Sequence, residues 1–312
     1  MASFAFVFPG QGSQSVGMLD AWSEHPAVRD TLDESSQALG QDLRQLIQQG
    51  PKEELDLTTN TQPVMLCAGI ACYRAWRAEG GAEPAAVAGH SLGEYSALVA
   101  AGVLSLADAL PLVRFRAQAM QQAVPVGTGA MAAVMGLDAA QVTEGCAKAM
   151  AESGEVVEAA NFNDAGQIVV SGSQAGVDKA REVLKAMGAK RFVPLPVSAP
   201  FHCSLMRPAA EALRERLAAV SFSAPRLALV NNVDVAVQSD PDAIRDALYR
   251  QAFGPVRWVE VVQALRQRGL THVLECGPGK VLTGMVRRID AELHTGSVFD
   301  PASLLECMDM VA

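Results

Sequence analysis

The sequence predicts an α/β fold, in which one mostly parallel sheet flanked by helices is interrupted by a small α+β insertion. Two short apolar runs, at residues 4–8 and 85–88, are each followed by helix-forming sequence, the alternation expected of parallel strands. Residues 128–197 have a different pattern, in which short predicted strands and helices follow one another closely. A chain of 312 residues is long enough for one large domain with an insertion.

The composition predicts a soluble globular protein of enzyme size. Half of the residues are hydrophobic and 19% are charged. Residues 1–10 lack the basic start of a secretory signal, and the longest uncharged apolar stretch, at 97–106, is too short to cross a bilayer. We therefore expect a cytoplasmic protein that does not associate with membranes.

Charge and cysteine content narrow the classes of partner. The net charge of −9 argues against nucleic acid and means that an acidic protein partner would need a local basic patch. The six cysteines are scattered without a Cys-x-x-Cys pair. This spacing favours buried, reduced thiols over a disulfide framework or a metal site.

The first part of the chain is predicted to contain the opening strand and several helices. The expected elements are a buried strand at 4–8, helical sequence at 18–50, a buried helix at 63–76 and an amphipathic helix at 106–124. On the last of these, Arg114 and Arg116 flank the apolar face almost symmetrically, so the periodicity does not say which one points into a site. The loop Gly10-Gln11-Gly12 lacks the third glycine of a dinucleotide fingerprint, which would fall at Ser15. The alternative is that its glycines bring a backbone N–H close to a reacting group.

The insertion has the element order βαββαβ, which is that of a ferredoxin-like module. Its predicted strands are 130–137, 156–161, 167–171 and 190–197, its helices are 139–153 and 174–187, and a turn is expected at 163–166. We therefore predict two domains, one built from residues 1–127 and 198–312 and the other from 128–197. In the resumed main body the expected elements are a helix ending at 219, a strand at 227–235 that contains Asn231 and Asn232, helices at 242–253 and 256–268, and a strand at 271–275.

The stretch Gly89-His90-Ser91-Leu92-Gly93 lies between a predicted strand and a predicted helix. In this context Gly-x-Ser-x-Gly indicates a nucleophile elbow, in which Ser91 occupies a strained tight turn. The flanking glycines leave room for the neighbouring backbone, and the hydroxyl is exposed at a helix N-terminus.

A serine hydroxyl needs a base, and His202 is the best of the five histidines. It lies in a loop where the main body resumes, whereas His90 sits inside the elbow and the other three are expected to be solvated or structural. The acids between Ser91 and His202 lie on predicted helices or in the insertion. A hydrolase-type triad acid is therefore missing, and the third member must be something other than a carboxylate.

Several motifs in order along the chain resemble those of bacterial malonyl-CoA:acyl carrier protein transacylases, which load malonyl units for fatty-acid synthesis. They are FPGQGSQ at 8–14, GHSLGE at 89–94, Arg116, PFH at 200–202, QAFGPVRW at 251–258 and ECGPG at 275–279. The resemblance implies a hydrolase-like α/β body with helices on both faces of the sheet and a ferredoxin-like subdomain. It also implies ping-pong transfer through a malonyl-serine intermediate, without a metal or redox cofactor.

The resemblance assigns roles to individual residues. Ser91 attacks the thioester, His202 carries the proton, and the main-chain carbonyl of Gln251 orients His202. The backbone N–H groups of Gln11 and Leu92 form the oxyanion hole. The residues expected to bind substrate are Arg116, Gln11, His90, Phe201 and Asn163.

By sequence alone Arg116 reads as an ordinary arginine on the flank of a helix. The resemblance implies that it selects malonyl, because a guanidinium grips a carboxylate with two parallel hydrogen bonds. Phe201 departs from the serine of several free-standing members and resembles the bulky residue of malonyl-selective polyketide acyltransferases. A ring at this position favours malonyl over methylmalonyl, although it is equally compatible with core packing.

The expected partners are malonyl-CoA and an acyl carrier protein, and the expected state is a monomer. Basic residues that are candidates for contacting the carrier are Lys190, Arg191, Lys280, Arg287 and Arg288. Alternatives on the same scaffold are a trans-acting polyketide-synthase acyltransferase and an acyl hydrolase of carrier proteins, and a third is a non-catalytic carrier-binding module. The presence of Arg116 favours transfer over hydrolysis, and the intact set of Ser91, His202, Gln11 and Arg116 argues against a decayed site.

Overall fold

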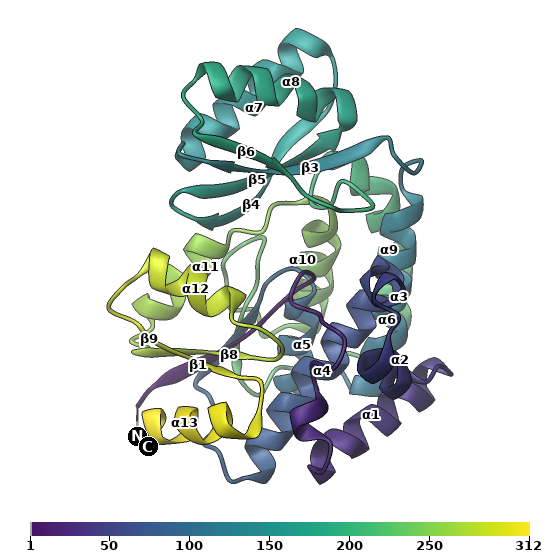
Figure 1. Ribbon diagram of the computed structural model, residues 1–312, viewed down its shortest axis with the longest axis vertical. Coiled ribbons are helices and arrows are strands. Elements are labelled where there is room, and N and C mark those ends of the chain that lie inside the picture. Colours follow the sequence, from purple (N-terminus) through teal and green to yellow (C-terminus); the bar gives the residue numbers. More distant parts are fainter. Residues whose placement is uncertain (1) are drawn as a thin grey trace.

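The computed structural model describes residues 2–312, and this part of the chain forms two sheets (Figure 1). The larger sheet has five parallel strands in the order β7-β2-β1-β8-β9. They are β1 (Phe4–Phe8), β2 (Ala86–Gly89), β7 (Ala228–Val230), β8 (His272–Cys276) and β9 (His294–Val298). The predicted parallel sheet is confirmed.

Strand β1 is central, and its two faces pack against different sets of helices. Phe4, Phe6 and Phe8 belong to one apolar core, and Ala5 and Val7 belong to another on the opposite face. A strand covered on both faces must be apolar throughout, which explains the continuous FAFVF sequence. The first core includes residues of α1 (Pro26–Leu39), α2 (Leu43–Gln49), α3 (Lys52–Asp56), α4 (Thr58–Ala78), α5 (Gly93–Ala100), α6 (Leu106–Gln122), α9 (Arg207–Ala219), α10 (Pro241–Phe253) and α13 (Pro301–Val311). The second includes residues of α11 (Trp258–Gln267) and α12 (Val281–Ile289).

The smaller sheet is antiparallel, with the order β4-β5-β3-β6. Its elements are β3 (Gly129–Met135), α7 (Ala139–Ser153), β4 (Val157–Asp164), β5 (Gln167–Ser173), α8 (Gln174–Ala186) and β6 (Arg191–Pro194). Helices α7 and α8 cover the outer face, and the other face is turned toward the larger part of the molecule (Figure 1). The predicted βαββαβ order is confirmed.

Backbone contacts attach the smaller sheet to the rest of the molecule. Asn161 of β4 forms a parallel bridge with Val256, just before α11. The amide of Phe162 donates to the Val256 carbonyl at 2.9 Å, and the Val256 amide donates to the Ala160 carbonyl at 2.8 Å. Strand β4 is therefore held against the segment that follows α10, and its last residues lie close to the elbow.

Several predicted boundaries were wrong. Strand β4 continues through Asp164, so Asn163 is a buried strand residue and not part of a turn. Strand β7 ends at Val230, because the chain turns at once and the Asp234 amide donates to Asn231 Oδ1 at 2.8 Å. Asn231 and Asn232 therefore follow the strand.

The helical stretch predicted at 18–50 is divided, because Gly40 ends α1 in the left-handed conformation with φ of +60°. A short 3₁₀ turn, Asp20–Trp22, precedes α1, and another, Ser204–Met206, precedes α9. Helix α4 begins before the predicted residue 63, so Thr58 and Gln62 are also on it. The sequence patterns did not predict the helices α3, α12 and α13 or the edge strand β9.

The described part of the chain has no helix with the length and apolar character needed to cross a bilayer. All six cysteines are buried, as predicted, and none is paired with another in the described residues. Burial raises the pKa of the Cys67 thiol to about 11 and that of Cys72 to about 12, so both remain protonated at neutral pH.

Candidate active site

The elbow has the close packing that its two glycines require. Ser91 has a φ of +51°, in the left-handed region that non-glycine residues rarely adopt. A Cβ at Gly89 would lie 1.9 Å from the backbone carbon of Gly93, and a Cβ at Gly93 would lie 2.0 Å from the Phe8 carbonyl oxygen. Only glycine allows β1, β2 and α5 to approach so closely, and this contact holds Ser91 at the carboxyl edge of the parallel sheet.

His202 faces Ser91 directly. Its Nε2 lies 2.6 Å from Ser91 Oγ, the distance of a hydrogen bond from the hydroxyl to the ring. His202 also has a positive φ, of +62°, and only 4% of its surface is exposed. Two strained residues therefore meet at one point, as is common where backbone strain serves a functional site.

Main-chain carbonyls take the place of the missing acid. His202 Nδ1 lies 3.0 Å from the Gln251 carbonyl oxygen and 3.2 Å from that of Gly254. Because both neighbours are acceptors, Nδ1 carries the hydrogen and Nε2 is left free to accept the Ser91 proton. Burial and the nearby Arg116 charge lower the pKa of His202 to about 3, so the ring is a neutral base at neutral pH.

The two predicted oxyanion donors lie beside the elbow. A Cβ at Gly10 would come within 2.7 Å of the His90 carbonyl oxygen, which shows how closely the loop after β1 packs on the elbow. Gln11 and Leu92 both line the cavity that contains Ser91. Within residues 2–312, neither backbone amide donates a hydrogen bond to another protein group. Both are available to an oxyanion.

Arg116 is buried within reach of the nucleophile. Its guanidinium donates to Gln62 Oε1 at 2.8 Å, to Gln251 Oε1 at 3.0 Å and to Ser91 Oγ at 3.3 Å. No carboxylate is among its hydrogen-bond partners in the described chain, although only 2% of the residue is exposed. A buried cation held by neutral groups has the charge and the donors to bind an anion.

Arg114, the other candidate on α6, is half-buried and donates to Gln41 Oε1 at 2.5 Å. It does not line the cavity. The structure therefore separates two arginines that the helical periodicity left equivalent.

His90 and Asn163 form one wall of the cavity. His90 Nε2 and Asn163 Oδ1 are 2.8 Å apart, and the imidazole packs edge-on against the Trp258 ring. Burial lowers the pKa of His90, and Nε2 carries the hydrogen because the group that faces it, the Asn163 amide oxygen, is an acceptor. Phe201 lines the cavity next to His202 and also packs against apolar residues of the smaller sheet.

The cavity has a volume of about 610 Å³ and lies between the smaller sheet and the loops and helices of the larger part. The larger part contributes the elbow, Arg116 and the loop after β1, and the smaller one contributes Met131 and Val169 among others. This volume lies within the range of small-molecule sites.

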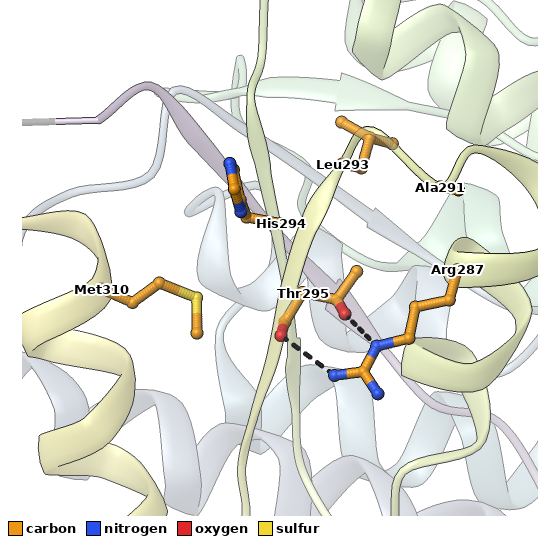
Figure 2. Close-up of a pocket in the computed structure, with 6 residues that line it drawn as sticks. All are labelled: Arg287, Ala291, Leu293, His294, Thr295 and Met310. Carbon is orange, nitrogen blue, oxygen red and sulfur yellow. Dashed lines mark hydrogen bonds between the residues drawn. The ribbon is translucent and has the colours of Figure 1, made fainter.

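A second hollow of about 430 Å³ lies on the outside of the molecule between α12, β9 and α13 (Figure 2). Here Arg287 Nε donates to Thr295 Oγ1 at 2.6 Å. This hollow shares no lining residue with the cavity that contains Ser91.

The basic candidates for carrier binding are dispersed. Arg287 faces the outer hollow, Arg288 pairs with Asp164 at 2.7 Å, and Lys280 lies over the Phe299 ring. Lys190 and Arg191 are exposed where β6 begins. None of the five lines the cavity, whereas Lys52, which the sequence analysis missed, does.

Three buried polar residues around the site were also missed. They are Gln62, which holds Arg116, Glu94 in the first turn of α5, and Asn232, whose Oδ1 accepts from the Ser91 amide at 2.8 Å. The paired asparagines after an apolar strand were a usable signal, because amides are seldom buried without a partner.

Comparison with known proteins agrees with this geometry. Residues 5–297 match the family model described as acyl transferase domain. The malonyl CoA-acyl carrier protein transacylase of Escherichia coli strain K12 is 51% identical over 311 residues, which are 99% of this chain and 100% of that protein. The counterpart of Bacillus subtilis is 45% identical over 97% of this chain and 96% of that protein.

Solved structures extend the likeness to three dimensions. An acyl-carrier-protein S-malonyltransferase from Burkholderia pseudomallei is 64% identical and superposes with a TM-score of 0.97, covering 98% of this chain and 99% of that one. A malonyl-transacylase solved in complex with a type II polyketide acyl-carrier protein is 47% identical, with a TM-score of 0.97 over 99% and 100% of the two chains. The chain belongs to the acyl transferase domain family and, within it, to the malonyl-CoA–acyl carrier protein transacylases.

Proposed function

We propose that the chain transfers a malonyl group from malonyl-CoA to the thiol of an acyl carrier protein for fatty-acid synthesis, through a malonyl ester of Ser91. The observation that carries the proposal is the placement of a nucleophile–base pair and a buried guanidinium in one cavity. Ser91 Oγ is 2.6 Å from His202 Nε2 and 3.3 Å from Arg116 Nη2.

The first half-reaction acylates the enzyme. Ser91 Oγ attacks the thioester carbonyl while His202 Nε2 accepts the hydroxyl proton. The backbone amides of Gln11 and Leu92 donate hydrogen bonds to the oxyanion. Each of these bonds lowers the barrier by about 3 kcal/mol, by comparison with other oxyanion donors. When the tetrahedral intermediate collapses, the carbon–sulfur bond breaks and protonated His202 returns its proton to the departing CoA sulfur.

The second half-reaction reverses these roles. His202 takes the proton of the carrier thiol, the thiolate attacks the malonyl ester, and Ser91 leaves with the proton that His202 gives back. The carbonyls of Gln251 and Gly254 stabilise the imidazolium that forms in each half. Arg116 holds the malonyl carboxylate with paired hydrogen bonds, and His90, Asn163 and Phe201 shape the cavity around the acyl group.

The carrier is an acyl carrier protein, as the names of the relatives state for those proteins. The first candidate is the carrier of fatty-acid synthesis. A polyketide carrier is the second candidate, which is supported by the 47% identical transacylase solved in complex with such a carrier. We assign chemistry to residues 1–127 and 198–312 and a covering role to 128–197. All proposed site residues come from one chain, so we propose that the protein is active as a monomer.

The test is intact-protein mass after brief mixing with malonyl-CoA, with Ser91→Ala as the control. One malonyl adduct that needs Ser91 is expected, and adding carrier protein should move it to the carrier. An adduct lost to water as quickly without carrier would indicate a hydrolase instead. Separate mixing with a fatty-acid carrier and a polyketide carrier decides between the two candidates.

A further inference from the structure

A buried carboxylate lies behind the nucleophile, outside the cavity. Glu94, in the first turn of α5, is 1% exposed. Its Oε2 accepts the side-chain amide of Gln251 and the backbone amide of Asn232, both at 3.0 Å. Burying a carboxylate is costly unless it is well partnered, so its presence here calls for a role.

The partners of Gln251 fix which way its amide points. Nε2 donates to the Ser91 carbonyl and to Glu94 Oε2, both at 3.0 Å, which uses both amide hydrogens. Oε1 must then face Arg116, whose Nη2 is 3.0 Å away. A reversed amide would place N–H donors against a guanidinium that has only donors. Glu94 excludes that arrangement because a carboxylate accepts and does not donate.

The amide in turn fixes the guanidinium. Gln251 Oε1 and Gln62 Oε1 hold the two terminal nitrogens of Arg116 from two different helices, α10 and α4. Glu94 reaches Arg116 only through the intervening Gln251 amide and does not touch the guanidinium. A direct ion pair would occupy the hydrogens that the malonyl carboxylate needs, whereas a bridged one leaves the guanidinium available.

We infer that Glu94 is a positioning residue for malonyl selectivity: it orients the Gln251 amide, which holds Arg116 where the malonyl carboxylate binds. The inference rests on the proposed function and deepens it. Burial raises the pKa of Glu94 to about 7, and the amides of Gln251 and Asn232 and the Arg116 charge oppose this rise.

The rival role for Glu94 is structural. Asn232, which donates its amide to Glu94, also supports the elbow through Oδ1 to the Ser91 amide and Nδ2 to the Gly89 carbonyl. Loss of that support would displace Ser91 and slow acylation by every acyl-CoA equally. The ratio of kcat/KM for malonyl-CoA to that for acetyl-CoA separates the two roles, because only the contacts that lead from Glu94 to Arg116 distinguish malonyl from acetyl.

The experiment compares kcat/KM for acylation of Ser91 by malonyl-CoA and by acetyl-CoA. Glu94→Met, which removes the acceptor, should lower the malonyl-to-acetyl ratio at least tenfold. Gln251→Met keeps the main-chain carbonyl for His202 and should lower it similarly. In the double variant the malonyl-to-acetyl ratio should fall no further than in the more affected single variant, because both changes break the same connection.

Two further variants complete the design. Glu94→Gln retains an acceptor oxygen and should keep the ratio within threefold of the wild type. Glu275→Gln neutralises another fully buried carboxylate, one that is bonded to Thr283 on α12, and should leave the ratio unchanged.

Equal loss for both substrates in Glu94→Met, with the ratio within twofold of the wild type, would overturn the inference in favour of the structural role. If that variant does not fold, an unchanged ratio in Gln251→Met overturns it. Wild-type enzyme that forms no malonyl-Ser91 adduct would instead defeat the proposed function, so the two failures are distinct.

Discussion

The two sheets contribute different things to the cavity. Ser91 follows β2 and Gln11 follows β1 of the parallel sheet, and His202, Arg116 and Gln251 come from the loops and helices packed on it. The antiparallel sheet contributes the apolar side chains of Met131 and Val169, with Asn161 and Asn163 as its polar groups. One region thus supplies the reacting groups, and the other supplies mostly shape.

The difference follows from strand geometry. Parallel strands all end at the same edge, so residues distant in sequence converge there. That convergence needs very close backbone contacts, such as those at Gly89 and Gly93. The antiparallel insertion has its own core under α7 and α8 and reaches the site only with the other face. Changes in the first region should therefore damage fold or chemistry, and changes in the second should adjust substrate choice.

The largest contrast is expected between two glycine substitutions. Gly93→Ala should destabilise the protein by more than about 4 kcal/mol, because its Cβ would meet the Phe8 carbonyl oxygen at 2.0 Å. Gly166→Ala, in the β4–β5 hairpin, should change stability by less than about 1 kcal/mol, since the nearest atom to its Cβ is 3.8 Å away. Urea unfolding measures both, and equal losses would refute the contrast.

The next largest effect is expected at Arg116. Arg116→Leu removes a buried charge-assisted contact worth about 3 kcal/mol, so kcat/KM for malonyl-CoA should fall by about 150-fold. The kcat/KM for acetyl-CoA should fall far less, so the preference of the enzyme shifts toward uncharged acyl groups. Arg114→Leu on the same helix is the matched control and should alter kcat/KM for neither substrate more than about twofold, because this half-buried side chain does not line the cavity. Unchanged malonyl selectivity in Arg116→Leu would remove the carboxylate clamp from the mechanism.

These two arginines also show where sequence reasoning ends. The elbow was predictable because its strand, glycines, serine and helix are contiguous, and a contiguous motif specifies its own geometry. The choice of Arg116 depends on Gln62 and Gln251, which are 54 and 135 positions away. No local period contains that information, and only the family resemblance pointed to Arg116.

The same limit explains the other omissions. Glu94 and Asn232 act on each other across 138 residues, so neither stands out in a window of sequence. Strand β9 has the sequence HTGSV, whose polar residues do not give the apolar run of a central strand, and it lies at the sheet edge. The insertion, with strong alternation and clear turns, was predicted with only its boundaries displaced.

A smaller effect concerns the pH dependence of the base. The acid limb of kcat/KM reports the pKa of the free enzyme, and His202 has its pKa lowered to about 3 by burial and by Arg116. Protonation disables the base, so a lowered pKa moves the acid limb to lower pH. Acylation by acetyl-CoA, which does not use the clamp, should keep its rate within about twofold between pH 7.5 and 5.5, whereas an ordinary histidine would lose about tenfold.

Arg116→Leu provides the control for this prediction. Removing the positive charge raises the pKa of His202, so the acid limb in the variant should move to higher pH than in the wild type. A wild-type limb near pH 6.5, or no movement in the variant, would contradict the assignment of His202 as a base that is neutral in the free enzyme.

The smallest expected effect lies at the boundary between the two regions, at Phe201. Its ring lines the cavity and packs against apolar residues of the smaller sheet. Phe201→Ser should open space for one α-methyl branch and raise the methylmalonyl-to-malonyl ratio about fourfold, the value of one buried methylene. Competition between the two CoA esters, followed by the mass of the acyl-Ser91 product, measures it. Phe222→Ser truncates a half-buried ring outside the cavity and should leave the ratio unchanged. An unchanged ratio in Phe201→Ser, with lower stability, would assign the ring to core packing and not to substrate choice.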